Sequence, residues 1–271
     1  MGLPIRVVDA FTDRPFGGNP AAVCILAEAR SPHWMQEVAQ EMNLSETAFL
    51  HRQADDFQLR WFTPTVEVDL CGHATLASAH VLWEAGHLQA HQTARFSTRS
   101  GVLAAQRNGE WIELDFPAQA AEQASPPPEL LAALGVTANY VGKNRFDYLV
   151  EVKDGQVVRD MRPDFRALAQ VAARGIIVTS QAASSSYDFV SRFFAPAVGI
   201  AEDPATGSSH CCLGPYWKTR LGKNEFVAYQ ASPRGGVIRV RLAEPRVLLG
   251  GKAVTVLRGE LVERRPDSAA C

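Results

Sequence analysis

The sequence predicts an α+β protein of two related lobes, each consisting mainly of strands around one buried helix. The first observation is an imperfect repeat: residues 60–71 (RWFTPTVEVDLC) align without a gap on residues 192–203 (RFFAPAVGIAED), at an offset of 192 − 60 = 132. Four identical pairs fall on alternate positions, as on one face of a strand: Arg60/Arg192, Phe62/Phe194, Pro64/Pro196 and Val66/Val198. Each copy then enters a turn and an apolar helical stretch. We therefore expect two lobes that each present a strand, a reactive side chain and a helix N-terminus to a shared cleft.

The length and composition agree with two globular lobes and exclude several classes of function. A chain of 271 residues predicts two domains of roughly 150 residues each. Hydrophobic residues make up 46% and charged residues 21%, which allows a core in each half. The net charge of −2 comes without a long basic run or aromatic residues interleaved with Lys and Arg, so we expect a small-molecule partner and no nucleic acid. No apolar run approaches the roughly 18 residues of a membrane span.

The cysteine pattern and the first residues of the chain predict a cytoplasmic location. The five cysteines are an odd set without paired metal spacing, and a strand pattern (IRVVDAF) begins directly, without a basic and apolar leader. The adjacent Cys211 and Cys212 are expected to be buried thiols on a helix rather than a strained disulfide.

The first half of the chain alternates strand signals with two helices. Ser31 and Pro32 form an N-cap followed by proline, and an apolar face continues from there to Asn43. The second helix covers residues 73–85, ends at Gly86, and has almost no polar face, so it is expected to be buried. The strands are predicted at residues 5–11, 22–26, 45–50, 57–62, 95–98, 102–106 and 111–116.

The second half repeats this plan after a linker. Residues 117–129 (PAQAAEQASPPPE) lack apolar periodicity and are expected to form a semi-rigid spacer. Strands follow near residues 148–152, 176–179 and 187–194, then a helix at residues 206–220 and strands to about residue 262. The predicted domains are an N-terminal lobe of residues 1–117, completed by a C-terminal strand near 253–263, and a second lobe of residues 118–263. Residues 264–271 are expected to be a mobile tail.

Glu46 is the first candidate for chemistry. It starts a short alternating strand and shares the face of Ala48 and Leu50, so its carboxylate points where apolar side chains point. A buried carboxylate is suited to general acid/base work near neutral pH. The alternative is a solvated glutamate at a strand end.

Cys71 and Asp203 align with each other at the ends of the two repeated segments. Asp203 precedes a proline, which is typical of a helix N-cap, but an aspartate there also orients a neighbouring imidazole. Cys71 at a helix start is either a nucleophile or base with a lowered pKa, or a buried inert thiol.

His73 lies in the first turn of the buried helix, after Gly72. The alternative to a functional role is a histidine that only hydrogen-bonds the backbone. Gly72 permits close approach of a ligand, and Gly207 and Ser208 occupy the corresponding region of the second lobe. Two helix N-termini that face one cleft present free N–H groups suited to a carboxylate or phosphate.

Cofactor and metal signatures are absent from the sequence. No G-x-G-x-x-G follows a strand, and neither a phosphate-binding loop nor H-E-x-x-H occurs. We therefore expect no cofactor and no metal centre.

Several short motifs together cover nearly the whole chain: Asp9-Ala10-Phe11-Thr12, Gly18-Asn19-Pro20-Ala21-Ala22-Val23, Asn43-Leu44-Ser45-Glu46-Thr47, Cys71-Gly72-His73-Ala74-Thr75 and Glu202-Asp203-Pro204-Ala205-Thr206-Gly207-Ser208. The set closely resembles the PhzF-like phenazine biosynthesis family. This resemblance implies the diaminopimelate epimerase-like fold, in which two pseudo-symmetric lobes each wrap a curved, mostly antiparallel sheet around a central helix. It also favours a homodimer.

The resemblance assigns roles to residues at matching positions. Glu46 is implied to be an acid/base that moves a proton between carbons without a cofactor, with His73, Asp203 and Ser208 around the substrate and Asn19, Gly72 and Gly207 in its binding site. Epimerases of this fold use two cysteines across the cleft. Here Cys71 takes the first position and Asp203 the second, which disfavours a two-thiol racemase. The phenazine enzymes have Ala-Gly-His-Pro where this chain has Cys-Gly-His-Ala, so its substrate is expected to differ.

The leading hypothesis is a cofactor-independent isomerase that shifts a proton on a small carboxylate-bearing substrate. The alternatives are a racemase or epimerase that uses Cys71 with an opposing carboxylate, and a non-catalytic binding protein on the same fold.

Overall fold

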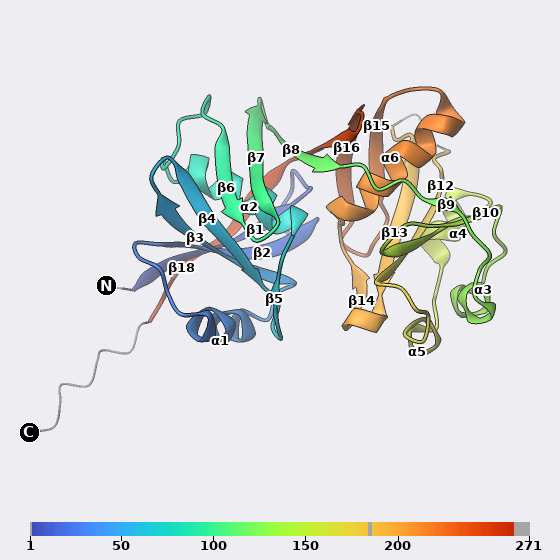
Figure 1. Cartoon of the computed structure of the whole chain (residues 1–271), viewed down its shortest axis with the longest axis horizontal. Coiled ribbons are helices and arrows are strands. Elements are labelled where there is room, and N and C mark those ends of the chain that lie inside the picture. The colour runs from blue at the N-terminus through green and yellow to red at the C-terminus, as the bar shows by residue number, and fades with distance from the viewer. Residues whose placement is uncertain (1, 184–185, 263–271) are drawn as a thin grey trace, which may run out of the picture.

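Two strand-rich lobes lie side by side in the computed structural model, which describes residues 2–183 and 186–262 (Figure 1). The predicted tail at residues 264–271 lies outside the described residues. Within the described part of the chain, no helix is both long and apolar enough to cross a membrane. The α+β fold predicted from the sequence is confirmed.

The first lobe contains the N-terminal elements and the last strand of the chain. Its helices are α1 (Pro32–Met42) and α2 (Gly72–Glu84). Its strands are β1 (Leu3–Ala10), β2 (Asn19–Leu26), β3 (Glu46–Gln53), β4 (Asp56–Phe62), β5 (Glu67–Val68), β6 (Ala94–Thr98), β7 (Gly101–Asn108), β8 (Trp111–Pro117) and β18 (Ala253–Leu261).

The second lobe contains four α-helices and one 3₁₀-helix among its described residues. They are α3 (Pro128–Leu134), α4 (Gly155–Asp160), α5 (Phe165–Leu168), η1 (Pro196–Val198) and α6 (Gly207–Leu221). Its strands are β9 (Glu122–Gln123), β10 (Tyr140–Lys143), β11 (Asp147–Glu151), β12 (Gly175–Gln181), β13 (Phe189–Ala195), β14 (Ile200–Asp203), β15 (Glu225–Gln230), β16 (Gly236–Ala243) and β17 (Arg246–Gly251).

The two lobes pair their strands in the same order. In the first lobe the order is β18-β1-β2-β3-β4-β6-β7-β8, with β2–β3 and β4–β6 parallel and the other neighbours antiparallel. In the second lobe it is β9-β10-β11-β12-β13-β15-β16-β17, with β11–β12 and β13–β15 parallel. The resemblance between the lobes therefore extends far beyond the twelve-residue repeat.

Strand exchange joins the lobes. β8 of the first lobe pairs with β17 of the second, so one sheet runs through both. β18 follows the second lobe in the sequence yet pairs with β1 in the first, while β9 follows the first lobe and pairs with β10 in the second. The first lobe thus takes its edge strand β18 from the end of the chain, and β9, directly after β8, forms the edge strand of the second lobe.

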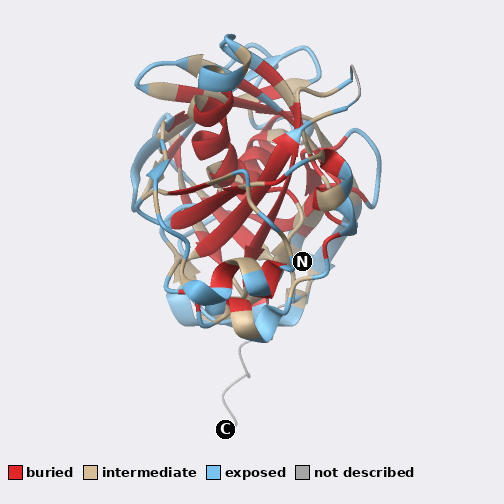
Figure 2. Cartoon of the chain, turned by 90° about the vertical axis from the view of Figure 1, so that its right-hand side faces the viewer, coloured by how far each residue is buried: buried red, intermediate tan, exposed pale blue. Residues whose placement is uncertain are grey.

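Each lobe encloses one central helix. α2 packs against β1, β2, β3, β7, β8 and β18, and most of its residues are buried, as its lack of a polar face predicts. α6 packs against β16 and β17 and is likewise buried along most of its length. Figure 2 shows buried residues concentrated in the central strands and helix, with exposed residues in the outer loops and short helices.

The repeated arginines make equivalent contacts in both lobes. The Arg60 guanidinium binds the Glu67 carboxylate with Nε–Oε1 and Nη2–Oε2 distances of 2.7 Å, and Arg192 binds Glu202 at 2.7 and 2.8 Å. Each guanidinium also lies over the phenylalanine two residues on, Phe62 or Phe194. The alternating identities in the sequence therefore mark a duplicated ion pair between a strand and the hairpin that follows it.

The ungapped alignment is wrong in its second half. Trp61 pairs with Val68, and its counterpart Phe193 pairs with Asp203, so the offset changes from 132 in the strands to 135 after the hairpin turn (203 − 68 = 135). The N-caps of the two central helices are Cys71 and Thr206. The residue equivalent to Cys71 is therefore Thr206, and the predicted match of Cys71 with Asp203 is incorrect.

Two further expectations need correction. Asp203 is not a helix N-cap, because β14 ends there and α6 begins at Gly207. The segment predicted as a semi-rigid spacer, residues 117–129, contains β9, and Gln119 N–H donates to the carbonyl of Cys211 at 3.0 Å. This hydrogen bond holds the segment against α6.

Candidate active site

Glu46 and His73 form a buried pair in the first lobe. Glu46 is the first residue of β3 and His73 the second residue of α2, and Glu46 Oε2 lies 3.0 Å from His73 Nε2. Their side chains are only 12% and 6% exposed. Glu46 therefore points toward the central helix, as the strand periodicity predicts, and is not a solvated glutamate at a strand end.

Asn19 connects this pair to the second lobe. Its amide nitrogen Nδ2 donates to Asp203 Oδ1 at 2.7 Å and to the Ala205 carbonyl at 3.0 Å, and it lies 3.1 Å from His73 Nδ1. The preceding turn requires glycine, because Gly18 has φ +58° and a Cβ there would lie 2.0 Å from the Ala10 carbonyl oxygen. That turn places Asn19, which is fully buried, between the lobes.

Asp203 is held from its own lobe as well. The Thr206 hydroxyl donates to Asp203 Oδ2, and Gln230 Nε2 donates to the Asp203 carbonyl at 2.7 Å. Burial raises the pKa of Asp203, while the positive charge of His73 and the hydrogen bond from Thr206 act in the opposite direction. The local hydrogen bonds fix the position of this carboxyl group at the end of β14.

The acidic neighbours of His73 raise its pKa. Burial alone would lower the pKa of His73, but the acidic groups of Cys71 and Glu46 outweigh it and hold this pKa well above its usual range. Burial, reinforced by Glu46, raises the pKa of the Cys71 thiol to about 11. A thiol with that pKa is protonated at neutral pH, so the Glu46 carboxylate is the partner that holds the positive imidazole.

Cys71 completes the first-lobe cluster. Its Sγ lies 3.5 Å from His73 Nδ1 and 4.0 Å from Nε2. The reactive groups of Glu46, Cys71 and His73 all lie within 4.8 Å of one another and offer an oxygen, a sulfur and a nitrogen to a metal ion. The sequence spacing did not reveal this set, because β3 and α2 bring its members together from separate segments.

The N-termini of α2 and α6 meet between the lobes. A Cβ on Gly207 would lie 3.8 Å from the Cα of Gly72. Neither helix receives a side-chain capping hydrogen bond from its N-cap residue, Cys71 or Thr206. The first-turn N–H groups of both helices are therefore not occupied by their caps, and the positive ends of two helix dipoles adjoin.

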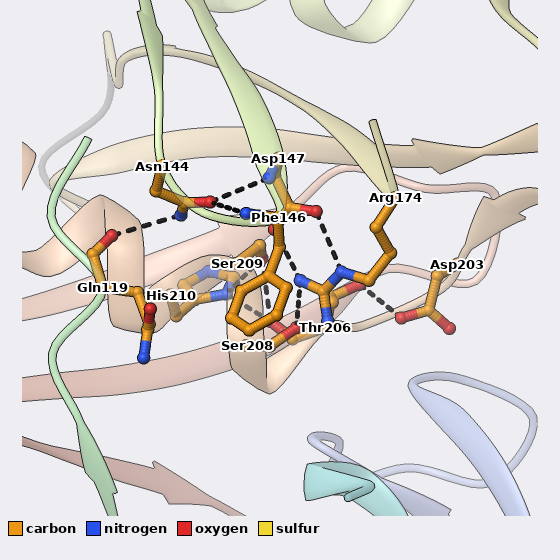
Figure 3. A network of polar contacts seen from close by, with 10 residues as sticks. All are labelled: Gln119, Asn144, Phe146, Asp147, Arg174, Asp203, Thr206, Ser208, Ser209 and His210. Carbon is orange, nitrogen blue, oxygen red and sulfur yellow. Dashed lines mark hydrogen bonds and ion pairs between the residues drawn. The ribbon is translucent and has the colours of Figure 1, made fainter. Parts of the chain in front are cut away.

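Ser208 lies in the first turn of α6 and contacts Arg174. Arg174 Nη2 donates to Ser208 Oγ at 3.2 Å, and the same guanidinium binds the buried carboxylate of Asp147, with Nε–Oδ1 at 2.9 Å (Figure 3). Phe146 and Phe193 lie against Arg174. Arg174 could not be identified from the sequence, because a single arginine before a strand carries no motif.

Two surface cavities lie away from this cluster. One, of about 380 Å³, includes Trp111, Tyr187 and Arg234 in its lining, and the other, of about 700 Å³, includes Arg159, Arg162 and Arg192. Glu46, His73 and Asp203 line neither cavity. In this conformation the side chains of His73 and Glu46 are 6% and 12% exposed.

Comparison with known proteins agrees with the motifs and the fold. The sequence profile of the phenazine biosynthesis-like protein family matches residues 8–259. The chain belongs to this family. A protein of Halalkalibacterium halodurans named as an uncharacterized isomerase is 59% identical over 263 residues, which cover 97% of this chain and 99% of that protein. The mouse phenazine biosynthesis-like domain-containing protein 2 is 42% identical over 96% of this chain and 99% of its own length.

Solved structures confirm the fold. A PhzF family protein of Enterococcus faecalis superposes with a TM-score of 0.93 at 43% identity, covering 97% of this chain and all of that one. A probable proline racemase from Agrobacterium radiobacter has a TM-score of 0.66 at 11% identity, covering 98% and 94% of the two chains, which shows a common fold alone. The relatives named as isomerases support an isomerase type of enzyme.

Proposed function

We propose that the protein is a cofactor-independent isomerase that shifts a proton on a small carboxylate-bearing substrate by general acid/base catalysis. The observation that carries this proposal is the buried Glu46–His73 pair at 3.0 Å, joined through Asn19 to Asp203 of the other lobe. A general base must lie within hydrogen-bond reach of the proton that it takes, in a site shielded from water. A closed cleft between two lobes supplies that shielding.

Glu46 is assigned the proton transfer. Its carboxylate removes a proton from one substrate carbon and returns it to another, so no electron acceptor is required. His73, held as the imidazolium, stabilises the negative charge that develops on the substrate, and Asp203 orients Asn19 and the neighbouring backbone. These roles agree with the positions of the three side chains on two lobes.

The substrate carboxylate is assigned to the adjoining N-termini of α2 and α6. Gly72 and Gly207 allow the backbone to approach a ligand, and the two helix ends each favour an anion by about 0.3–1 kcal/mol. Because a methyl group added at Gly207 would already lie 3.8 Å from the Cα of Gly72, an acid group enters between the two helix ends only if the lobes move apart. Substrate binding therefore requires opening followed by closure.

A hydrogen-exchange screen tests this function. Candidate carboxylic acids are incubated with the enzyme in D₂O, and deuterium incorporation at carbon is followed by NMR or mass spectrometry. Ligands are first selected by thermal shift, since a ligand at 100 times its Kd adds about 2.7 kcal/mol to stability. The proposal predicts carbon-bound exchange in at least one ligand, and stabilising ligands that never exchange would favour the binding-protein alternative.

The second candidate is an epimerase that uses Cys71. The observation in its favour is the 3.5 Å contact of Cys71 Sγ with His73 Nδ1. Burial raises the pKa of the Cys71 thiol to about 11, which weighs against it, because little thiolate is then present at neutral pH. The equivalent position in the other lobe is Thr206, so the partner of Cys71 in such a mechanism is a carboxylate and not a second thiol.

A further inference from the structure

The cluster of Glu46, Cys71 and His73 contains a reactive side chain that a proton shift does not require. A carboxylate and an imidazole suffice for general acid/base catalysis, and the thiol has no part in it. A thiolate, an imidazole and a carboxylate are, however, the three side-chain types that bind Zn²⁺ in proteins. From this set we infer that Glu46, Cys71 and His73 form a binding site for Zn²⁺, or a metal ion of similar softness, and that its occupation inhibits the enzyme.

Two of the three distances between ligand atoms are close to those around a tetrahedral ion, and the third, between Cys71 Sγ and the Glu46 carboxylate, is within 4.8 Å. With Zn–N of about 2.0–2.1 Å, Zn–S of about 2.3 Å and Zn–O of about 2.0–2.2 Å, tetrahedral angles place nitrogen about 3.4 Å from oxygen and about 3.6 Å from sulfur. Here His73 Nε2 lies 3.0 Å from Glu46 Oε2 and 4.0 Å from Cys71 Sγ, each within about 0.4 Å of those values. Small rotations of the three side chains supply the difference.

The charges balance as well. Zn²⁺ carries two positive charges, and the Cys71 thiolate with the Glu46 carboxylate carries two negative ones, while His73 binds as the neutral imidazole. Metal binding releases the thiol proton and the proton on His73 Nε2 to solvent. A neutral ion cluster is the form that a buried site accommodates at least cost.

Secondary structure holds the ligands in place, and an ion that enters the site replaces the contact between Glu46 Oε2 and His73 Nε2. Glu46 belongs to β3 and His73 to α2, and Cys71 is the α2 N-cap but makes no side-chain capping hydrogen bond. Three protein ligands also leave a fourth position open, as in zinc sites that bind water or a small molecule. The ion enters by the opening that the substrate requires.

Inhibition is expected because the metal ion and the proposed proton transfer use the same atoms of Glu46 and His73. The Glu46 oxygen that accepts a substrate proton is bound to the ion, and the imidazole that stabilises the developing charge becomes a ligand. This regulatory consequence rests on the proposed isomerase function, whereas metal binding itself does not. We therefore expect Zn²⁺ to compete with substrate and a chelator to restore activity.

Direct metal binding is tested with Co²⁺ on the full-length, chelator-treated protein. A thiolate ligand to Co²⁺ gives a charge-transfer absorption in the near ultraviolet, and Zn²⁺ added afterwards abolishes it by displacement. We expect about one Co²⁺ per chain. Cys71→Ala should remove this absorption and weaken Zn²⁺ binding by at least tenfold. Glu46→Gln should also weaken Zn²⁺ binding by at least tenfold but keep the absorption, because it keeps the thiolate ligand. Cys211→Ala, which removes a buried thiol of α6, is the matched control and should bind like the wild type.

The outcomes separate the inference from the proposed function. The site is supported if the wild type and Cys211→Ala show the absorption and folded Cys71→Ala does not. This result holds even if no isomerase substrate is found. If Cys71→Ala does not fold, Cys71→Ser keeps a polar atom of similar size and should also lose the absorption. The site is overturned if the folded wild type shows no absorption at millimolar Co²⁺. It is also overturned if the absorption persists in Cys71→Ala. Metal binding that leaves turnover unchanged overturns the inhibition.

Discussion

Asn19 Nδ2 of the first lobe lies 2.7 Å from Asp203 Oδ1 of the second, and the same nitrogen lies 3.1 Å from His73 Nδ1. One buried amide thus touches a proposed catalytic group from each lobe. Because hydrogen bonds within its own lobe fix Asp203, the contact between Asn19 and Asp203 depends on how closely the two lobes approach each other.

Asn19→Leu should uncouple the two lobes. A leucine of similar size leaves the buried Asp203 carboxyl without one of its donors, which costs about 1–3 kcal/mol of folding free energy. We expect activity to fall by more than tenfold while substrate affinity changes less. Chemical denaturation and steady-state kinetics measure both, and Asn108→Leu at an exposed position of β7 is the control. Full activity in Asn19→Leu would remove this residue from the site.

Cys71→Ala should lower activity modestly at most, because the assigned proton transfer uses Glu46 and the equivalent position of the other lobe is Thr206. Steady-state kinetics of the folded variant measure this directly. Treatment with iodoacetamide is an independent check. If alkylation abolishes turnover and Cys71→Ala reproduces the loss without unfolding, the epimerase mechanism replaces the one proposed.

His210 should make the folded protein sensitive to acid. Burial lowers the pKa of His210 to about 4, below the usual value for an unfolded chain of about 6.5. The unfolded state therefore takes up a proton first as the pH falls, so stability is full above about pH 7 and decreases toward pH 4, by about 3 kcal/mol. Denaturation at pH 8 and pH 4 should show a smaller decrease in His210→Gln, and the exposed His91→Gln should behave like the wild type. Equal decreases in all three proteins would count against this assignment.

Gly207→Ala should weaken substrate binding with little effect on stability. The added methyl lies 3.5 Å from Leu249 Cδ1 and 3.8 Å from Gly72 Cα, which are ordinary contacts, but it occupies the space between the two helix N-termini. We expect Kd to rise at least tenfold and Tm to change little. Gly259→Ala on β18, whose methyl also makes only ordinary contacts, is the matched control. Unchanged binding would move the substrate carboxylate to another part of the site.

The sequence predicted the parts of the fold that depend on local pattern. The alternating identities at Arg60 and Arg192 identified the duplicated strand, and the apolar length of α2 identified a buried central helix. Most strands of both lobes were located for the same reason. The short elements of the second lobe, such as α4, α5 and β14, were not located, because they are held by tertiary contacts more than by periodicity.

The site could be predicted less completely. The sequence motifs named Glu46, His73 and Asn19, and the structure brings these three together with Asp203. The ungapped alignment could not reveal that the second lobe has three additional residues in its hairpin, which makes Thr206 the counterpart of Cys71. Arg174 was missed because its contact with Ser208 depends on strand register in β11 and β12.

The central claim is that Glu46 moves the substrate proton, and the most direct test is solvent-deuterium incorporation catalysed by Glu46→Gln. Glutamine keeps the size of the side chain but has no carboxylate, and loss of a general base typically lowers rates by about 10²–10⁴. The account predicts that the purified variant binds ligand and unfolds like the wild type, yet incorporates no measurable deuterium into substrate or product. Near wild-type incorporation by Glu46→Gln would contradict it.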